Sequence, residues 1–208
     1  MSVLYRKSIQ DIARRRARSF FTIATIAAAV ASLSLFALPT LMDRAMQSRI
    51  ANDRLHDVRI PMMDIELTPA DCDSLAALPG VAAIESRTTY FGEVRIGDRR
   101  EDLVLVGVRD FASQQVNVVE LQQGEVPSGD GVLSDAENAS SGRLKPGAVA
   151  TLQVEDNSGQ LHEVSLSGVG RTLQYSQEAF EGSVVLYASQ ATVNRIAGAR
   201  GVNSLEIR

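Results

Sequence analysis

The longest feature of the hydrophobic pattern is a run without any charged residue from Ser19 to Met42. Its apolar core, Phe20 to Leu38, reads FFTIATIAAAVASLSLFAL. An α-helix of about 20 residues is about 30 Å long, which matches the thickness of the hydrocarbon core of a bilayer. The pattern therefore predicts one transmembrane helix over residues 19–42.

After this run, apolar residues keep a helical spacing as far as about Leu55, and Pro61 ends the pattern because proline does not continue a helix. We expect residues 43–60 to form a stalk that extends the membrane helix. Beyond Pro61 the pattern changes to short apolar segments separated by turn residues, which is typical of strands. The predicted strands are Met63–Leu67, Val81–Ser86, Tyr90–Ile96, Asp102–Val108, Val149–Val154, Leu161–Val169, Ser183–Tyr187 and Ser204–Ile207.

Three short helices interrupt these strands. In the first, Thr68 is the expected N-cap, Pro69 lies in the first turn and Asp71 complements the helix dipole. The predicted helices cover residues 68–78, 134–143 and 189–197. Strands that alternate irregularly with short helices indicate an α+β fold, and we expect one such domain over residues 61–208.

Charge is distributed unevenly along the chain. Residues 1–18 carry a net charge of +5, whereas the whole chain of 208 residues carries −4, so the remainder carries −9. Basic residues next to a membrane span stay in the cytoplasm. We therefore expect residues 1–18 in the cytoplasm and residues 43–208 outside the plasma membrane. An acidic body also argues against nucleic-acid binding.

The basic segment has an amphipathic pattern of its own, with Tyr5, Ile9 and Ile12 at helical spacing. A helix of this kind lies in the membrane interface and places guanidinium groups on lipid phosphates. The expected membrane anchors are Arg6, Arg14, Arg15, Arg16 and Arg18. The alternative is an unstructured tail whose charge only fixes the orientation.

Two questions about the span remain open in the sequence. Residues 29–31 read Ala-Val-Ala, a possible signal-peptidase site, but the apolar run continues to Leu38, which favours a retained helix over a cleaved signal. Ala24, Ala28 and Ser32 form a small-residue ladder, which favours packing against further membrane helices. The alternative is that alanine is simply frequent in this chain.

No motif indicates an enzyme or a cofactor site. The single cysteine, Cys72, lies between two aspartates, and the two histidines, His56 and His162, lack partners at metal-ligand spacing. The Gly168-Val169-Gly170 segment lacks the third glycine of a dinucleotide fingerprint, so we expect these glycines to allow a close strand approach or a bulge. We predict no catalytic residue, no metal and no cofactor.

The order of features resembles MacB/FtsX-type ABC transporter permeases. The basic Ile12–Ile23 segment leads into the first helix as in that family. The rest is similar to the family's MacB-like periplasmic core domain, through phrases that occur in the family's order. They are LAALPGV at 75–81, LVGV at 105–108, GEVP at 124–127, GVLS at 131–134, LKPG at 144–147, VSLSGV at 164–169 and NSLEI at 203–207.

This resemblance implies a permease component in the inner membrane of a bacterium, working with a separate ABC ATPase subunit. Family members continue into three further membrane helices, so we interpret the sequence as the front portion of a permease that needs those helices or a second permease subunit. The family couples ATP hydrolysis to extracytoplasmic movement for export, lipoprotein extraction or regulation of an extracytoplasmic enzyme. The alternative function is a binding module that is anchored by one helix or secreted.

Overall fold

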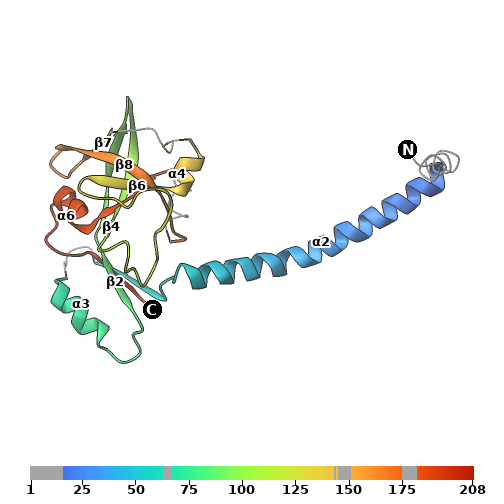
Figure 1. The fold of residues 1–208 in the computed structure, drawn as a ribbon, viewed down its shortest axis with the longest axis horizontal. Coiled ribbons are helices and arrows are strands. Elements are labelled where there is room, and N and C mark those ends of the chain that lie inside the picture. The colour runs from blue at the N-terminus through green and yellow to red at the C-terminus, as the bar shows by residue number, and fades with distance from the viewer. Residues whose placement is uncertain (1–15, 63–66, 143, 145–150, 175–181) are drawn as a thin grey trace. The chain divides into compact units, whose positions relative to one another are not determined.

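A computed structural model describes residues 16–62, 67–142, 144, 151–174 and 182–208. The chain forms two compact units, Met1–Ser48 and Arg49–Arg208. The first described element is α2, a single helix of 37 residues from Arg16 to Asn52, which passes through Pro39 without ending (Figure 1). Arg16 and Arg18 lie in its first turn, while Arg6, Arg14 and Arg15 lie outside the described residues.

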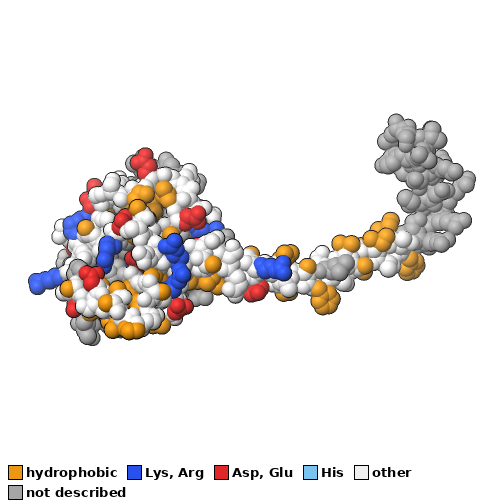
Figure 2. Space-filling view, turned by 60° about the horizontal axis from the view of Figure 1, so that its bottom comes forward, with side chains coloured by type: hydrophobic (Ala, Val, Ile, Leu, Met, Phe, Trp, Pro, Cys, Tyr) orange, Lys and Arg blue, Asp and Glu red, His pale blue; other side chains and the backbone are white. Residues whose placement is uncertain are grey.

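Within the described part of the chain, α2 is the one helix long and apolar enough to cross a membrane. Its large apolar side chains are not covered by other parts of the described chain (Figure 2), and Phe20 is 68% and Phe36 82% exposed. Hydroxyl groups along the helix are satisfied within it, because Thr25 donates to the carbonyl of Phe21 and Ser32 to that of Ala28, at 2.7 and 2.8 Å. Polar residues that bond to their own helix are compatible with hydrocarbon.

The second unit is built on a seven-stranded sheet with the order β5-β8-β6-β9-β4-β3-β7. An additional pairing of β8 with β7 closes this sheet into a barrel, with β5 added beside the later half of β8. The pairs β4–β9 and β6–β8 are parallel and the others are antiparallel. The strands are β3 (Thr89–Ile96), β4 (Arg99–Val108), β5 (Glu120–Gly124), β6 (Gly131–Asp135), β7 (Thr151–Glu155), β8 (Leu161–Arg171) and β9 (Val184–Ser189).

Two hydrophobic clusters hold the barrel, one on each side of its central strands. Leu103 and Leu105 of β4 belong to the larger cluster, together with Ile196 of helix α6 (Gln190–Ala197), which lies beside β4 (Figure 1). Val104 and Val106 belong to the second cluster. Burial on both faces explains why the second part of β4, Leu103–Val108, is continuously apolar rather than alternating.

A second sheet of three strands lies in the same unit, with the order β1-β10-β2. Its strands are β1 (Val58–Pro61), β10 (Ser204–Ile207) and β2 (Ile84–Arg87). The expected stalk over 43–60 is therefore helical only as far as Asn52, and its last residues pair with β10 as an edge strand. Proline fits at Pro61 because an edge strand does not need every N–H group.

The predicted α+β class is confirmed, and so are its three helices, although they are shorter than expected. Helix α3 (Pro69–Ala76) begins with a capping box: the Asp71 N–H donates to the Thr68 hydroxyl at 3.3 Å, and the Thr68 N–H donates to the Asp71 carboxylate at 2.9 Å. These hydrogen bonds from Thr68 hold the pKa of Asp71 below its usual value. Helix α4 covers Ala136–Ser140, and α6 runs from its N-cap Ser189 to Gly198, which has φ +68°.

The prediction for the glycines of β8 is also confirmed. A Cβ atom at Gly168 would collide with the carbonyl of Gln123 on β5, and one at Gly170 would crowd Val119 and Leu133. The β5–β8 register shifts between Leu121 and Gln123, so β5 follows β8 through an irregular pairing. These glycines therefore serve close strand packing.

Candidate functional site at the end of helix α2

The site begins where α2 ends, and all of its residues belong to the unit Arg49–Arg208. After Asn52 the chain turns at Arg54, which has a φ of +50°. The main-chain carbonyls of Asp53 and Arg54 accept hydrogen bonds from the N–H groups of Val118 and Asn117, at 2.9 and 3.0 Å. The last turn of the helix is thus continued by main-chain contacts to a loop that lies more than sixty residues later.

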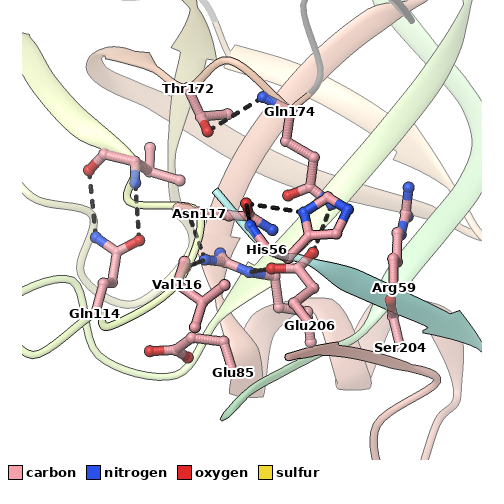
Figure 3. A network of polar contacts seen from close by, with 12 residues as sticks. His56, Arg59, Glu85, Gln114, Val116, Asn117, Thr172, Gln174, Ser204 and Glu206 are labelled. Carbon is pink, nitrogen blue, oxygen red and sulfur yellow. Dashed lines mark hydrogen bonds and ion pairs between the residues drawn. The ribbon is translucent and has the colours of Figure 1, made fainter. Parts of the chain in front are cut away.

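Asn117 is the centre of these contacts (Figure 3). Its side-chain oxygen accepts a hydrogen bond from the His56 N–H at 3.1 Å and lies 3.0 Å from Nδ1 of the same histidine. Asn117 is 1% exposed and has a φ of +49°, a left-handed conformation that asparagine tolerates better than most residues. The loop around it is held by Gln114, whose amide bonds both the N–H and the carbonyl of Val119.

A buried ion pair joins the same loop to the three-stranded sheet. Nε of Arg87 on β2 lies 2.8 Å from a carboxylate oxygen of Glu206 on β10, and the two side chains are 1% and 0% exposed. The guanidinium also donates to the carbonyls of Val116 and Asn117, at 3.0 and 2.9 Å. The amide of Gln174 donates to the other Glu206 oxygen at 2.6 Å. We call Arg54, His56, Arg87, Asn117 and Glu206 the junction.

The junction is continuous with strand β1 as well. The Asp57 N–H donates to the carbonyl of Ile207 at 2.8 Å, and pairing then runs from Val58 to Pro61. The end of α2 is therefore connected to the three-stranded sheet by two routes, one along the chain into β1 and one through Asn117 and Arg87. This arrangement is suited to passing a displacement of the helix end to the sheet, because buried hydrogen-bonded networks are rigid.

Replacing Asn117 tests how firmly the helix end is held. Asn117→Ala removes the side-chain contacts with His56 and places alanine in a left-handed conformation, so we expect a loss of about 2 kcal/mol in the free energy of unfolding. Asn117→Gly removes the contacts without the backbone penalty and should cost about 1 kcal/mol. Urea dependence of labelling of the buried Cys72 thiol in the full chain measures both. Two variants as stable as the parent would show that Asn117 does not hold the junction.

Glu85 on β2 adds a pH-dependent group next to the junction, directly across from Glu206 in the β2–β10 pairing. Burial raises the pKa of Glu85 above its usual value, against a hydrogen bond from the Gln115 N–H and the charges of Arg87 and Arg109. A carboxyl group with a raised pKa binds its proton more tightly in the folded state. Its contribution to stability is therefore complete below its usual pKa of 4.5 and is lost as the pH rises through the folded-state pKa.

We therefore expect Glu85→Gln to remove part of the decline in thermal stability between pH 4.5 and neutral pH. Circular dichroism melting curves of the full chain and the variant at several pH values give the difference. Parallel pH profiles for the two proteins would contradict the assignment.

The described residues contain no group of three or more His, Cys, Asp or Glu side chains that could hold a metal ion. His56 contacts Asn117, and His162 lies 2.9 Å from a carboxylate oxygen of Asp156 on the β7–β8 hairpin. Cys72 is buried in α3. None of these described positions brings a nucleophile and a base together.

Sequence reasoning did not find the junction. Its predicted site residues lie in the amino-terminal segment and on α2, and Ala24, Ala28 and Ser32 are exposed on that helix. A signal was nevertheless present, because Glu206 lies between Leu205 and Ile207 in one predicted strand and Arg87 directly follows another. Buried charges require a partner of opposite sign.

No family model matches the sequence, and a search of curated proteins finds no match. Among solved structures, the chain is similar to the extracellular domain of the noncanonic ABC-type transporter YknZ from Gram-positive bacteria. The TM-score is 0.49 and the identity 14%, over 72% of this chain and 81% of that chain.

It is also similar to the periplasmic region of MacB from Actinobacillus actinomycetemcomitans. Here the TM-score is 0.47 and the identity 15%, over 72% of each chain. At this level of identity the likeness concerns the fold. The chain thus carries an apolar amino-terminal helix and a mixed α/β domain similar to the extracytoplasmic domains of MacB and YknZ.

Proposed function

We propose that this chain is a permease component of an ABC transporter in the inner membrane of a bacterium. The observation that carries the proposal is the junction. In it Asp53 and Arg54, directly after the apolar helix, accept main-chain hydrogen bonds from the loop at Asn117, and the buried Arg87–Glu206 ion pair holds the same loop to the three-stranded sheet. A helix that only tethers a domain needs no such connection. A helix that must move the domain needs a firm connection to it.

In this proposal a separate ATPase subunit hydrolyses ATP in the cytoplasm, and the resulting movement of membrane helices reaches the domain through α2. The domain then acts on its target outside the membrane, in export, in lipoprotein extraction or in regulation of an extracytoplasmic enzyme. The order of family phrases from residue 12 to residue 207 supports this assignment. The basic residues Arg6, Arg14, Arg15, Arg16 and Arg18 would hold the cytoplasmic end at the lipid phosphates.

The direct test is purification of the tagged full chain in a mild detergent, followed by mass spectrometry of the proteins that remain bound. The proposal predicts an ABC ATPase, together with membrane helices of a permease, at a constant ratio to the chain. Recovery of the chain alone under conditions that preserve a reference ABC complex would contradict it and favour an anchored binding module.

The small-residue face of α2 gives a prediction within this proposal. Ala28→Leu adds bulk between Ala24 and Ser32, so it should reduce the co-purified membrane partner while leaving insertion intact, because close helix packing in lipid requires small residues. Val30→Leu, on the opposite side of the helix, is the matched control. Equal recovery of the partner with both variants would show that this face is not a packing surface.

A further inference from the structure

A half-buried glutamate lies beside the loop that receives the end of α2. Glu85 on β2 pairs directly with Glu206 on β10, so the two carboxylates extend from the same face of the three-stranded sheet (Figure 3). The Glu85 carboxylate accepts a hydrogen bond from the Gln115 N–H at 3.0 Å. Two residues further along this loop, the Asn117 N–H donates to the carbonyl of Arg54. One side chain of the sheet therefore contacts the same loop that holds the helix end.

The cations around Glu85 are engaged by other groups. Arg87 binds the Glu206 carboxylate and two carbonyls of the loop. Arg109, directly after β4, donates to the Ser86 hydroxyl. Both guanidinium groups act on Glu85 through space, and the charge of Glu206 opposes them; these are the charged groups that act on Glu85 among the described residues. Burial outweighs the two cations and raises the pKa of Glu85, so its charged form is disfavoured while the loop is closed.

Opening of the loop would relieve this cost. A charged Glu85 regains its hydration when Gln115 moves away, whereas a neutral carboxyl group gains little and still accepts the Gln115 N–H. Local opening of a loop requires less free energy than unfolding of the whole domain. It would also strain the hydrogen bonds that Asn117 and Val118 donate to the residues after α2.

We propose that Glu85 is a proton-dependent latch on the junction. Its neutral form keeps the loop closed on the three-stranded sheet, and its charged form favours opening of the loop and loosens the attachment of α2. This regulation rests on the proposed function, in which the junction passes movement of the helix to the domain. Acid then strengthens that connection, and neutral pH weakens it.

Hydrogen–deuterium exchange with mass spectrometry tests the latch in the full chain in phosphatidylcholine nanodiscs. The reporter is a peptide that covers residues 115–118, which includes N–H groups that bond to Glu85 and to the residues after α2. Exchange is compared at about pH 4 and about pH 7, with times scaled to the chemical exchange rate. We expect protection of the reporter to be roughly threefold to tenfold lower at neutral pH, because loss of the Glu85 proton is linked to loop opening. A peptide from β9 should keep its protection, since that strand is buried in the barrel.

Glu85→Gln keeps an acceptor for the Gln115 N–H and cannot ionise, so its reporter peptide should be equally protected at both pH values. Glu163→Gln is the matched control, because Glu163 is exposed on β8, and it should behave as the parent chain does. His56 also contacts Asn117, and a pH dependence that persists in Glu85→Gln would assign the effect to that histidine and overturn the proposal.

Three further results would overturn the latch: unchanged protection of the reporter in the parent chain, an equal loss of protection in the β9 peptide, or loss of the pH dependence in Glu163→Gln as well. The measurement needs no ATPase subunit. The latch and the proposed permease function can therefore fail separately, because only the latter depends on the proteins that co-purify with the chain.

Discussion

Glu206→Ala is expected to lower the free energy of unfolding of the second unit by about 3–5 kcal/mol, the usual cost of leaving one member of a buried ion pair without its partner. The variant would leave the Arg87 guanidinium, which is 1% exposed, without its counter-charge. Gln174 would lose its acceptor at the same time. Urea titration followed by far-ultraviolet circular dichroism of the full chain measures the effect, and labelling of the buried Cys72 thiol gives a second readout.

Two controls separate this effect from a general sensitivity to charge. Arg99, whose side chain is 60% exposed, forms an ion pair with Glu101, so Arg99→Ala should cost at most about 1 kcal/mol. The double variant of Arg87→Ala with Glu206→Ala should cost clearly less than the sum of the two single variants, because each single change leaves a buried charge. Additive costs, or a Glu206→Ala effect as small as that of Arg99→Ala, would show that the ion pair does not hold the junction.

Val30→Arg gives the second large expected effect. A charged residue near the centre of a membrane helix costs about 2.5–3.5 kcal/mol in apparent insertion free energy. Val30 lies near the middle of the apolar run and is 57% exposed on α2, so the arginine would face lipid or a neighbouring helix. We expect a marked fall in the fraction of chain that resists alkaline extraction from membrane vesicles.

The matched control is again Val30→Leu, which should insert as well as the parent chain because its side chain is at least as apolar. Equal resistance of the Val30→Arg and Val30→Leu variants to alkaline extraction would mean that α2 does not cross the hydrocarbon core.

The parts of the fold that were predictable from sequence are those with a local cause. Thr68, Pro69 and Asp71 specify the start of α3 within four residues, and Ser189 and Gly198 bracket α6. The continuous apolar segment of β4 likewise follows from burial on both faces, which needs no knowledge of the partner strands.

The elements that were missed depend on distant partners. Strand β5 is exposed along its length, so its sequence has no alternation of apolar and polar residues. It forms because its main chain pairs with the edge of β8. Strand β6 is short and contains the polar residues Ser134 and Asp135, which hide its strand pattern. The buried Asp135 carboxylate is stabilised by a hydrogen bond from the Tyr187 hydroxyl at 2.8 Å. The sequence predicts a stalk over most of β1, because the pairing of this strand with β10 joins residues far apart in sequence.

The junction was hidden for the same reason. Arg87 and Glu206 are 119 positions apart, and the sequence alone does not state that β2 and β10 are neighbours. Asn117 is also unremarkable in sequence, and its role appears only when the end of α2 and the loop before β5 are seen together. The glycines of β8 differ, since the absence of a phosphate-loop pattern already favoured a packing role, which their contacts confirm.

The central claim is that one uncut helix crosses the membrane and separates a cytoplasmic amino terminus from the folded domain. Single cysteines test it most directly, introduced in a Cys72→Ser background by Ser8→Cys in the basic segment and by Asn157→Cys in the exposed β7–β8 turn. A membrane-impermeant maleimide added to spheroplasts should label the Asn157→Cys protein at once and the Ser8→Cys protein only after permeabilisation. Labelling of both from the outside, labelling of neither before permeabilisation, or a mature chain that begins after Ala31 would contradict the account.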